Sequence, residues 1–338
     1  MYDIFRIEVY SENCKALKLK NIIHHTSHII HFMDGKGKGY IALTITSIVW
    51  GTTWVASKIG VKEVPALQMA SIRQFIAGTC MVLFFLFFKK MPLPTAKQFR
   101  WLLVMAFLMF VFANGFSMWG IQYIPAGLGA LIGALYPLSV VIIERVFLKK
   151  KNMTAITFVG LFLGIAGIAI VFYEHAFAHK GPNFFLGLCL SIFAMLAWSL
   201  GTVFLSRNKA NLNPYYGTGW QMLIGSVILF IMAYTTQKPV NIFSISINTW
   251  GIIAYLVAVG SVGAFIAFIY SMKKLPAAIA SLYAYINPLV AMLVASFLLN
   301  EHLTMNILWG SIVTLLGVYL VNYSIKKTNE KIIAEAEL

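Results

Sequence analysis

Charged residues are scarce in this sequence: only 11% of its 338 residues are Asp, Glu, Lys or Arg, while 60% are apolar. A soluble domain usually has about 25% charged residues. Apolar runs such as MVLFFLFF at 81–88 and LVMAFLMFVFA at 103–113 would need a core too large for a chain of this size. The composition therefore excludes a soluble globular protein and predicts an all-α integral membrane protein.

Cysteines are also few, and Cys14, Cys80 and Cys189 share no spacing typical of a metal or redox site. The glycine-rich stretch AGLGALIGALYP at 126–137 lacks the Lys-Ser or Lys-Thr that ends a phosphate loop, and its small residues favour close packing of membrane helices. The apolar segments hold no nucleophile–base pair for an intramembrane enzyme. We therefore predict no cofactor and no catalysis.

The first 39 residues are polar and include HHTSHIIH at 24–31. On a helix, His24, His28 and His31 would share one face, a spacing that can bind a metal. No carboxylate or thiolate accompanies them, so we favour a solvated or loosely membrane-associated arm with no metal. Translation that begins at Met33 is a further alternative, because MDGKGKG leads directly into the first apolar segment.

Windows long enough to cross about 30 Å of hydrocarbon predict ten transmembrane helices joined by short connections. They lie at 40–60, 66–88, 99–123, 126–148, 154–173, 184–206, 214–235, 249–271, 277–299 and 305–325. The predicted organisation is a cytoplasmic arm at 1–39, a first five-helix unit at 40–173, a second unit at 184–325 and a cytoplasmic tail at 326–338.

The net charge is +15, and the distribution of the basic residues along the chain predicts the topology. With ten spans, one set of connections and both termini fall on the same side, and this side holds 21 of the 26 Lys and Arg. The opposite side has only Lys58, Lys62, Lys180 and Lys238. The positive-inside bias makes the basic side cytoplasmic. We therefore predict a multi-pass protein of the cell (inner) membrane with both termini in the cytoplasm, and not a nucleic-acid-binding protein.

An internal repeat relates the two units. The segment YIPAGLGALIGALYPL at 123–138 aligns without gaps on KLPAAIASLYAYINPL at 274–289. The matched positions include Pro125 with Pro276, Pro137 with Pro288, Gly160 with Gly310, Gly167 with Gly317, Trp50 with Trp198 and Arg73 with Gln221. Since each unit has an odd number of helices, the second copy must enter the membrane inverted. Inverted repeats are typical of transporters that open alternately to either side of a central site.

These residues resemble the EamA-type family of the drug/metabolite transporter superfamily. The resemblance covers about residues 40–325 and depends on IVWGTTWVASK, SIRQFIAG and LLNEHLTMNILWGSIVTLLGVYLV. The last segment is similar to the signature that closes a repeat, with Glu301 at its acidic position; the first repeat has Lys150 and Lys151 there instead. The resemblance implies ten helices around a central cavity and transport of amino acids, sugars or other small metabolites, often outward.

Arg73 lies about seven residues inside the second predicted helix, roughly 10 Å from its end. A cation at that depth costs a few kcal/mol or more unless it is paired or hydrated. One interpretation is that Arg73 faces the cavity and pairs with an anionic substrate group. The alternatives are that it braces backbone carbonyls of a neighbouring helix, which its resemblance to the family's helix 2 arginine favours, or that it extends toward the membrane surface.

Polar and amphipathic residues deep in the spans are the candidate substrate-binding residues, because buried amides need partners that a hydrated pocket supplies. They are Trp50, Trp54, Arg73, Asn114, Ser117, Tyr136, Trp198, Gln221, Tyr285 and Asn287. For each aromatic residue, ordinary packing is the alternative. Pro137 and Pro288 would remove backbone hydrogen bonds in equivalent helices, so we predict hinges there.

The predicted spans place no carboxylate or histidine near the membrane midplane. Glu144, Glu301 and the histidines all fall near span ends, in outer connections or in the arm. This favours facilitated diffusion or exchange over carboxylate-driven proton coupling. The prediction is a secondary transporter that exports its substrate in the family's manner and acts as a monomer or weak homodimer, with a small-molecule substrate and the lipid bilayer as partners. A small-solute channel or facilitator is the alternative.

Overall fold

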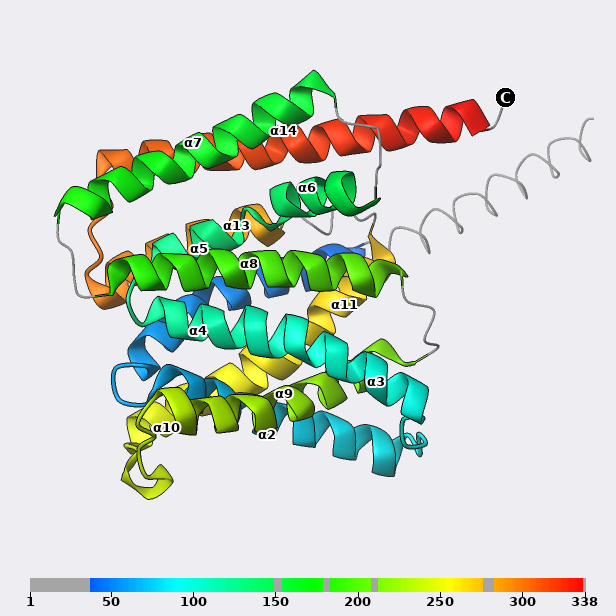
Figure 1. Cartoon of the computed structure of the whole chain (residues 1–338), viewed down its shortest axis with the longest axis vertical. Coiled ribbons are helices and arrows are strands. Elements are labelled where there is room, and N and C mark those ends of the chain that lie inside the picture. The colour runs from blue at the N-terminus through cyan, green and yellow to red at the C-terminus, as the bar shows by residue number, and fades with distance from the viewer. Residues whose placement is uncertain (1–36, 149–153, 179–182, 208–211, 276–282, 337–338) are drawn as a thin grey trace, which may run out of the picture.

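The computed structural model describes residues 37–148, 154–178, 183–207, 212–275 and 283–336 (Figure 1). All regular secondary structure in these ranges is helical, which confirms the predicted all-α class. The elements are α2 Ala66–Leu83, η1 Phe84–Phe88, α3 Ala96–Met105, η2 Ala106–Gly115, α4 Phe116–Ile121, α5 Ala126–Gly133, α6 Tyr136–Leu148, α7 Ala155–Ala178, α8 Phe184–Arg207, α9 Pro214–Thr236, η3 Ile242–Ser244, α10 Ile247–Tyr255, η4 Leu256–Gly263, α11 Ala264–Lys274, α13 Tyr283–Leu299 and α14 Met305–Ala336. The helix Gly37–Gly60 precedes them. The predicted arm lies almost wholly outside the described residues.

Eight helices of the described chain are long and apolar enough to cross a membrane. They are Gly37–Gly60, Ala66–Phe88, Ala96–Ile121, Ala126–Ile143, Phe184–Leu205, Pro214–Thr236, Ile247–Lys274 and Met305–Thr328. Two shorter apolar helices, Ala155–Val171 and Tyr283–Leu299, fall in the other two predicted windows. The protein is therefore a multi-pass membrane protein, and ten crossings stay a prediction.

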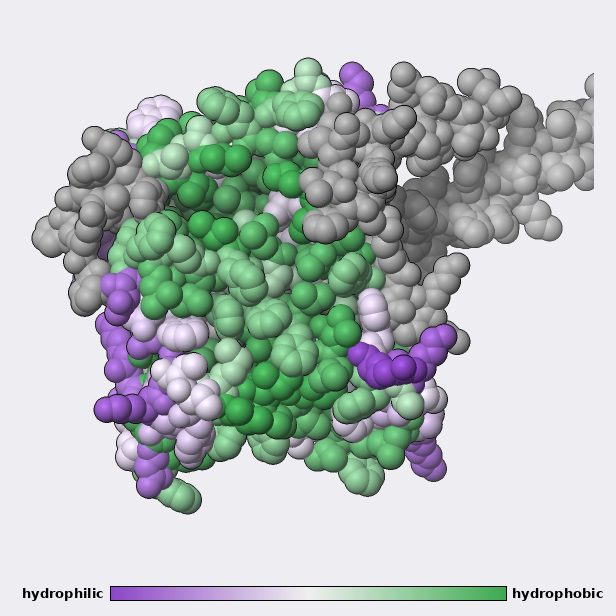
Figure 2. Space-filling model, viewed as in Figure 1, coloured by the Kyte–Doolittle hydropathy of each residue, from purple (hydrophilic) through white to green (hydrophobic). Residues whose placement is uncertain are grey.

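The surface of the bundle matches a lipid environment. On the face in Figure 2, hydrophobic residues cover the middle of the bundle, and hydrophilic residues gather toward the helix ends. Large apolar side chains point outward: Phe162 is 71% exposed and Phe297 is 82% exposed. Contiguous apolar surface of this extent marks a membrane-facing region.

Glycines allow α7 and α14 to pack along each other at one side of the bundle (Figure 1). A Cβ added at Gly160 would lie 2.7 Å from the carbonyl oxygen of Gly317, and one added at Gly310 would lie 2.7 Å from that of Gly167. Only glycine permits so close an approach. Because Gly160 meets Gly317 while Gly167 meets Gly310, the two helices run antiparallel. The glycines that the internal repeat aligned are thus each other's packing partners.

A second close helix pair, α2 and α9, lies on the opposite side of the bundle (Figure 1). A Cβ at Gly78 would lie 2.9 Å from the carbonyl oxygen of Gly219. The hydroxyl of Ser71 donates to the carbonyl oxygen of Ser226 at 2.9 Å. Ser71 precedes Gly78 in α2, whereas its partner Ser226 follows Gly219 in α9, so these two helices run antiparallel as well.

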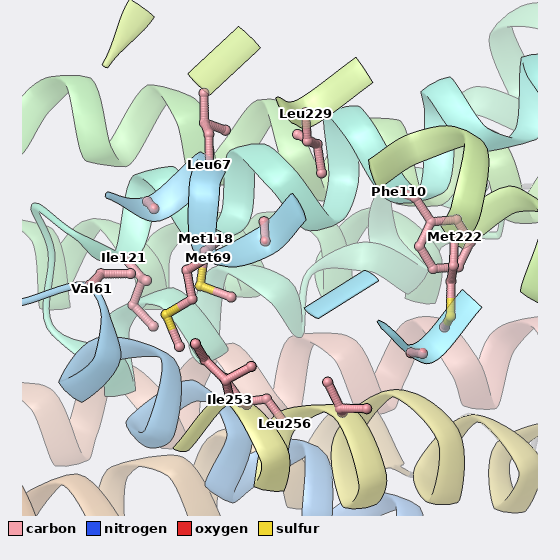
Figure 3. Close-up of a cluster of buried hydrophobic side chains, with 14 of the residues drawn as sticks. Val61, Leu67, Met69, Phe110, Met118, Ile121, Met222, Leu229, Ile253 and Leu256 are labelled. Carbon is pink, nitrogen blue, oxygen red and sulfur yellow. The ribbon is translucent and has the colours of Figure 1, made fainter. Parts of the chain in front are cut away.

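The main apolar core joins α2, α9 and the π-helical segments. Figure 3 shows members of this cluster, including Leu67, Phe110, Met222, Leu229 and Leu256, whose side chains converge from these helices. All five are at most 1% exposed. Removing such a side chain costs about 2–5 kcal/mol of folding free energy, so this core holds the helices that carry the site in place.

The predicted hinges differ between the two units. Pro288 lies inside α13, but α5 ends at Gly133 and α6 begins at Tyr136, so Pro137 lies in the first turn of α6. An N–H in a first turn has no intrahelical partner, so proline costs nothing there. The span predicted at 126–148 is thus one apolar span, Ala126–Ile143, with a turn at 134–135 between α5 and α6, ahead of the proline. A hinge role for either proline stays a prediction.

Candidate central cavity

A cavity of about 190 Å³ lies between the helices. Residues of the helix Gly37–Gly60 and of α2, η2, α4, α5, α6, α8, η4, α11 and α13 line it. Both predicted units therefore contribute. Drug-sized pockets hold about 300–1,000 Å³, so this cavity suits a small metabolite.

Eight of the ten predicted site residues line this cavity. They are Trp50, Trp54, Arg73, Asn114, Ser117, Tyr136, Trp198 and Asn287. Gln221 and Tyr285 are not among the lining residues. Gln221 is buried within α9, and the hydroxyl of Tyr285 accepts a hydrogen bond of 2.6 Å from the Asn322 amide of α14. The repeat thus pairs Arg73, which lines the cavity, with a glutamine that does not.

Arg73 is the only Asp, Glu, Lys or Arg among the described residues that line the cavity. It is 9% exposed, and its Nη2 donates to Oδ1 of Asn114. Within the described part of the chain, its Nε has no hydrogen-bond partner. The bracing interpretation expected backbone carbonyls as the partners of Arg73, whereas the hydrogen bond in the structure is to the Asn114 side chain. The cavity carries one positive charge with an unused donor.

Two more lining residues hold buried polar atoms without a partner in the described chain: the hydroxyl oxygen of Ser191 and Oδ1 of Asn287. A buried polar atom without a partner costs about 1–3 kcal/mol, and most such atoms in proteins are satisfied. Three such atoms belong to residues that line this one cavity, which makes the cavity the candidate binding site.

Aromatic rings cluster around Trp50 at the cavity wall, and those of Trp198, Phe265 and Tyr283 line the cavity with it. The ring centroid of Trp50 lies 5.2 Å from that of Phe265, 5.1 Å from that of Phe268, 5.3 Å from that of Tyr283 and 6.3 Å from that of Trp198. Nε1 of Trp50 donates to the carbonyl oxygen of Gly260 at 3.2 Å. This fixed indole joins both units at the centre of the bundle, and we call these five rings the aromatic floor.

Sequence reasoning missed several lining residues. Phe265 and Tyr283 are indistinguishable in sequence from ordinary aromatic residues of an apolar span, and only the tertiary structure brings them to Trp50. The small polar residues Thr53, Ser57 and Ser191 were also missed. Serine and threonine in membrane helices usually bond their own backbone, so they carry little signal.

The glycines of α5 make room for Trp54. A Cβ at Gly129 would lie 3.0 Å from the Trp54 ring, and one at Gly133 would lie 3.4 Å from it. The glycine-rich stretch at 126–137 is therefore a packing surface for an indole. It shapes the cavity wall and offers no anion cradle.

π-Helical segments occur at matching places in the two units. η2 lies in the third predicted helix and η4 in the eighth, and both line the cavity through Asn114 and Gly260. π-Helices are rare and frequently mark functional sites. Their position beside the cavity in both units supports its functional importance.

Opposite charges hold the α4–α5 corner beside the cavity. The ammonium of Lys58 donates to the carbonyl oxygens of Ile121 and Ile124, both at 2.8 Å. One carboxylate oxygen of Glu301 accepts a hydrogen bond of 2.9 Å from the Ala126 N–H, at the start of α5. A cation at a helix C-terminus and an anion at a helix N-terminus both complement the helix dipole.

A helical membrane protein with a cavity between its helices, lined by polar and aromatic residues, has the architecture of a membrane transporter. The sequence model of the EamA-like transporter family matches residues 37–173 and 185–323. The chain belongs to this family, which confirms the resemblance found in the sequence.

Several relatives are similar along most of the chain. "Uncharacterized transporter YoaV" of Bacillus subtilis is 22% identical over 86% of this chain and 98% of its own length. "Uncharacterized inner membrane transporter YedA" of Escherichia coli K12 is 28% identical over 78% of this chain and 83% of its own. A solved crystal structure of a protein aligns with a TM-score of 0.61 at 15% identity, covering 86% of this chain and 99% of the other, which shows the fold alone.

Proposed function

We propose that this protein is a secondary transporter that moves a small metabolite, such as an amino acid or a related solute, across the cytoplasmic membrane by alternating access. The observation that carries the proposal is the cavity itself. It is central, takes residues from both units, and holds three buried polar atoms without partners in the described chain. These atoms are what a bound polar solute would satisfy.

The helix packing supports inverted units with ten crossings. α7 and α14 occupy equivalent places in the two units and run antiparallel, and so do α2 and α9. Antiparallel equivalents are expected when the second unit is inverted. In this proposal the first unit spans 40–173 and the second 184–325, and the basic connections place both termini in the cytoplasm.

The aromatic floor supports alternating access rather than an open channel. Trp50 comes from the first unit, and the rings of Phe265 and Tyr283 that contact it come from the second, so in this proposal the contact closes one end of the cavity. A relative movement of the units would separate these rings and open that end. The resemblance to a family whose members often transport outward favours outward transport. A monomer or weak homodimer would suffice because residues of one chain line the cavity.

Transport is tested with purified protein in proteoliposomes. A thermal-stability screen against metabolite pools first finds ligands, because a ligand that binds the native state raises the unfolding midpoint. Uptake of each radiolabelled ligand is then measured with and without unlabelled ligand inside the vesicles. We expect saturable uptake that internal ligand accelerates. Flux that neither saturates nor responds to internal ligand would indicate a channel and contradict the proposal.

Trp50→Ala and Asn287→Ala test whether the cavity is the route. We expect each to reduce exchange at least tenfold, because each removes a lining group that both units surround. Gly251→Ala is the matched control, since a Cβ there meets nothing within 4 Å. Unchanged exchange in both cavity variants would place the route elsewhere.

A further inference from the structure

The charge balance of the cavity restricts its ligand. Among the described lining residues there is one full charge, the Arg73 guanidinium, and no carboxylate faces it. Arg73 is also 9% exposed, so solvent screens its charge little. A buried charge without a counter-charge is costly. A ligand with a net charge of −1 would neutralise the cavity, whereas a zwitterion would bring a cation for which no lining acid is present.

The geometry of Arg73 favours a planar anion. Its Nη2 is bonded to Asn114, but its Nε is buried and has no partner in the described chain. A guanidinium presents its N–H groups as a fork that matches the two oxygens of a carboxylate. Asn114 also lines the cavity, and a side-chain amide has N–H groups that can donate to the same ligand. Arg73 and Asn114 therefore offer donors that suit a carboxylate.

The aromatic floor favours an apolar body on the same ligand. Trp50 and Trp198 line the cavity with their rings 6.3 Å apart in an edge-to-face arrangement, and Phe265 lies against both. Aromatic walls of this kind bind flat apolar groups through offset and edge contacts. The cavity thus combines one cationic site with one aromatic surface.

We propose that the ligand is a small organic monocarboxylate with an apolar or aromatic body, bound through its carboxylate at Arg73 and Asn114, and that an α-ammonium group does not contribute to binding. This rests on the proposed function in so far as the ligand of the cavity is the transported solute. It narrows that function from amino acids and related solutes to organic acids.

Three matched probes test this: 3-phenylpropionate, 3-phenylpropionamide and L-phenylalanine. They share the phenylethyl body and differ in the carboxylate or the α-amino group. Binding is measured as the rise in unfolding midpoint of the purified full chain in detergent. We expect 3-phenylpropionate to raise the midpoint, with roughly tenfold or more weaker binding of the amide and of L-phenylalanine. An equal response to the amide or to L-phenylalanine, or no response to 3-phenylpropionate, would overturn the proposal.

Variants separate ligand recognition from folding. We expect Arg73→Gln to abolish the response to 3-phenylpropionate and Arg73→Lys, which keeps the charge without the fork, to leave a reduced one. Gln74→Ala is the control: Gln74 is buried beside Arg73 and donates to the carbonyl oxygen of Phe110, but it does not line the cavity. Its response should equal that of the wild type. An Arg73→Gln protein that is folded and responds fully would overturn the role of Arg73.

Binding and transport are scored separately. If 3-phenylpropionate fails to bind while other solutes exchange across proteoliposomes, the ligand class is wrong and the transport function stands. If 3-phenylpropionate binds through Arg73 but no solute crosses the vesicles, the ligand class holds and the transport function fails.

Discussion

Replacing Glu301 should weaken the corner between α4 and α5 without touching the cavity lining. Its Oε1 accepts from the N–H of Ala126 at 2.9 Å, and its Oε2 accepts from that of Gly127 at 3.4 Å. The residue at the N-cap of α5 is Pro125, and its side chain makes no capping hydrogen bond. Glu301 therefore supplies both the acceptor and the negative charge at this helix start.

The size of the effect follows from these two contributions. Loss of an N-cap acceptor costs about 0.5–2 kcal/mol, and loss of a charge at a helix N-terminus costs about 0.3–1 kcal/mol. Glu301→Ala removes both and should lower the free energy of unfolding by about 1–3 kcal/mol. Glu301→Gln keeps an acceptor and should lose only the charge contribution, less than about 1 kcal/mol.

Thermal unfolding of the purified protein, followed by intrinsic fluorescence, measures the difference. We expect the midpoints to fall in the order wild type, Glu301→Gln, Glu301→Ala, with ligand-induced midpoint shifts that stay the same in all three. Equal midpoints for Glu301→Ala and wild type would refute the capping role. A midpoint loss in Glu301→Gln as large as in Glu301→Ala would show that charge alone matters.

Three further predictions concern other parts of the molecule. Ser246 and Thr249 donate hydrogen bonds to the exposed carboxylate of Glu63 and lower its pKa below the usual 4.5. The stabilisation that Glu63 contributes to folding is therefore full above pH 4.5 and is lost as the pH falls through the lowered pKa. The difference in unfolding midpoint between wild type and Glu63→Gln should shrink over that pH range. Gly310→Ala should cost about 1–3 kcal/mol through overpacking, since its Cβ would lie 2.7 Å from a carbonyl oxygen of α7, and denaturant unfolding should show no comparable loss for Gly251→Ala, where a Cβ meets nothing. Replacing Pro137 and Pro288 together by alanine should impair transport more than expression, and unchanged flux would argue against hinges.

Much of the cavity could be predicted because it depends on residue type and depth. A membrane span tolerates an amide or a cation only with a partner, so Arg73, Asn114 and Asn287 were conspicuous among apolar neighbours, and all three line the cavity. Gln221 satisfies the same criterion yet lies off the cavity. The position of a residue in the sequence gives its distance from the helix end, but it does not give the direction in which its side chain points.

The antiparallel packing of α7 against α14 had a sequence basis too. The aligned glycines Gly160, Gly167, Gly310 and Gly317 are the ones that meet, because only a residue without a side chain lets two helix backbones approach closely. The turn between α5 and α6 was not predicted, and Pro137, where we expected a hinge, lies beyond this turn, in the first turn of α6.

The sequence by itself determined that this chain is a membrane protein of duplicated helical units, because the apolar run lengths, the basic connections and the paired motifs are local properties of the chain. Only the tertiary structure decided which polar groups share one cavity, which aromatic rings line it, and that Lys58 and Glu301 hold the same corner. These are contacts between residues far apart in sequence, and their partners depend on helix rotation and packing, which the order of residues along one helix does not specify.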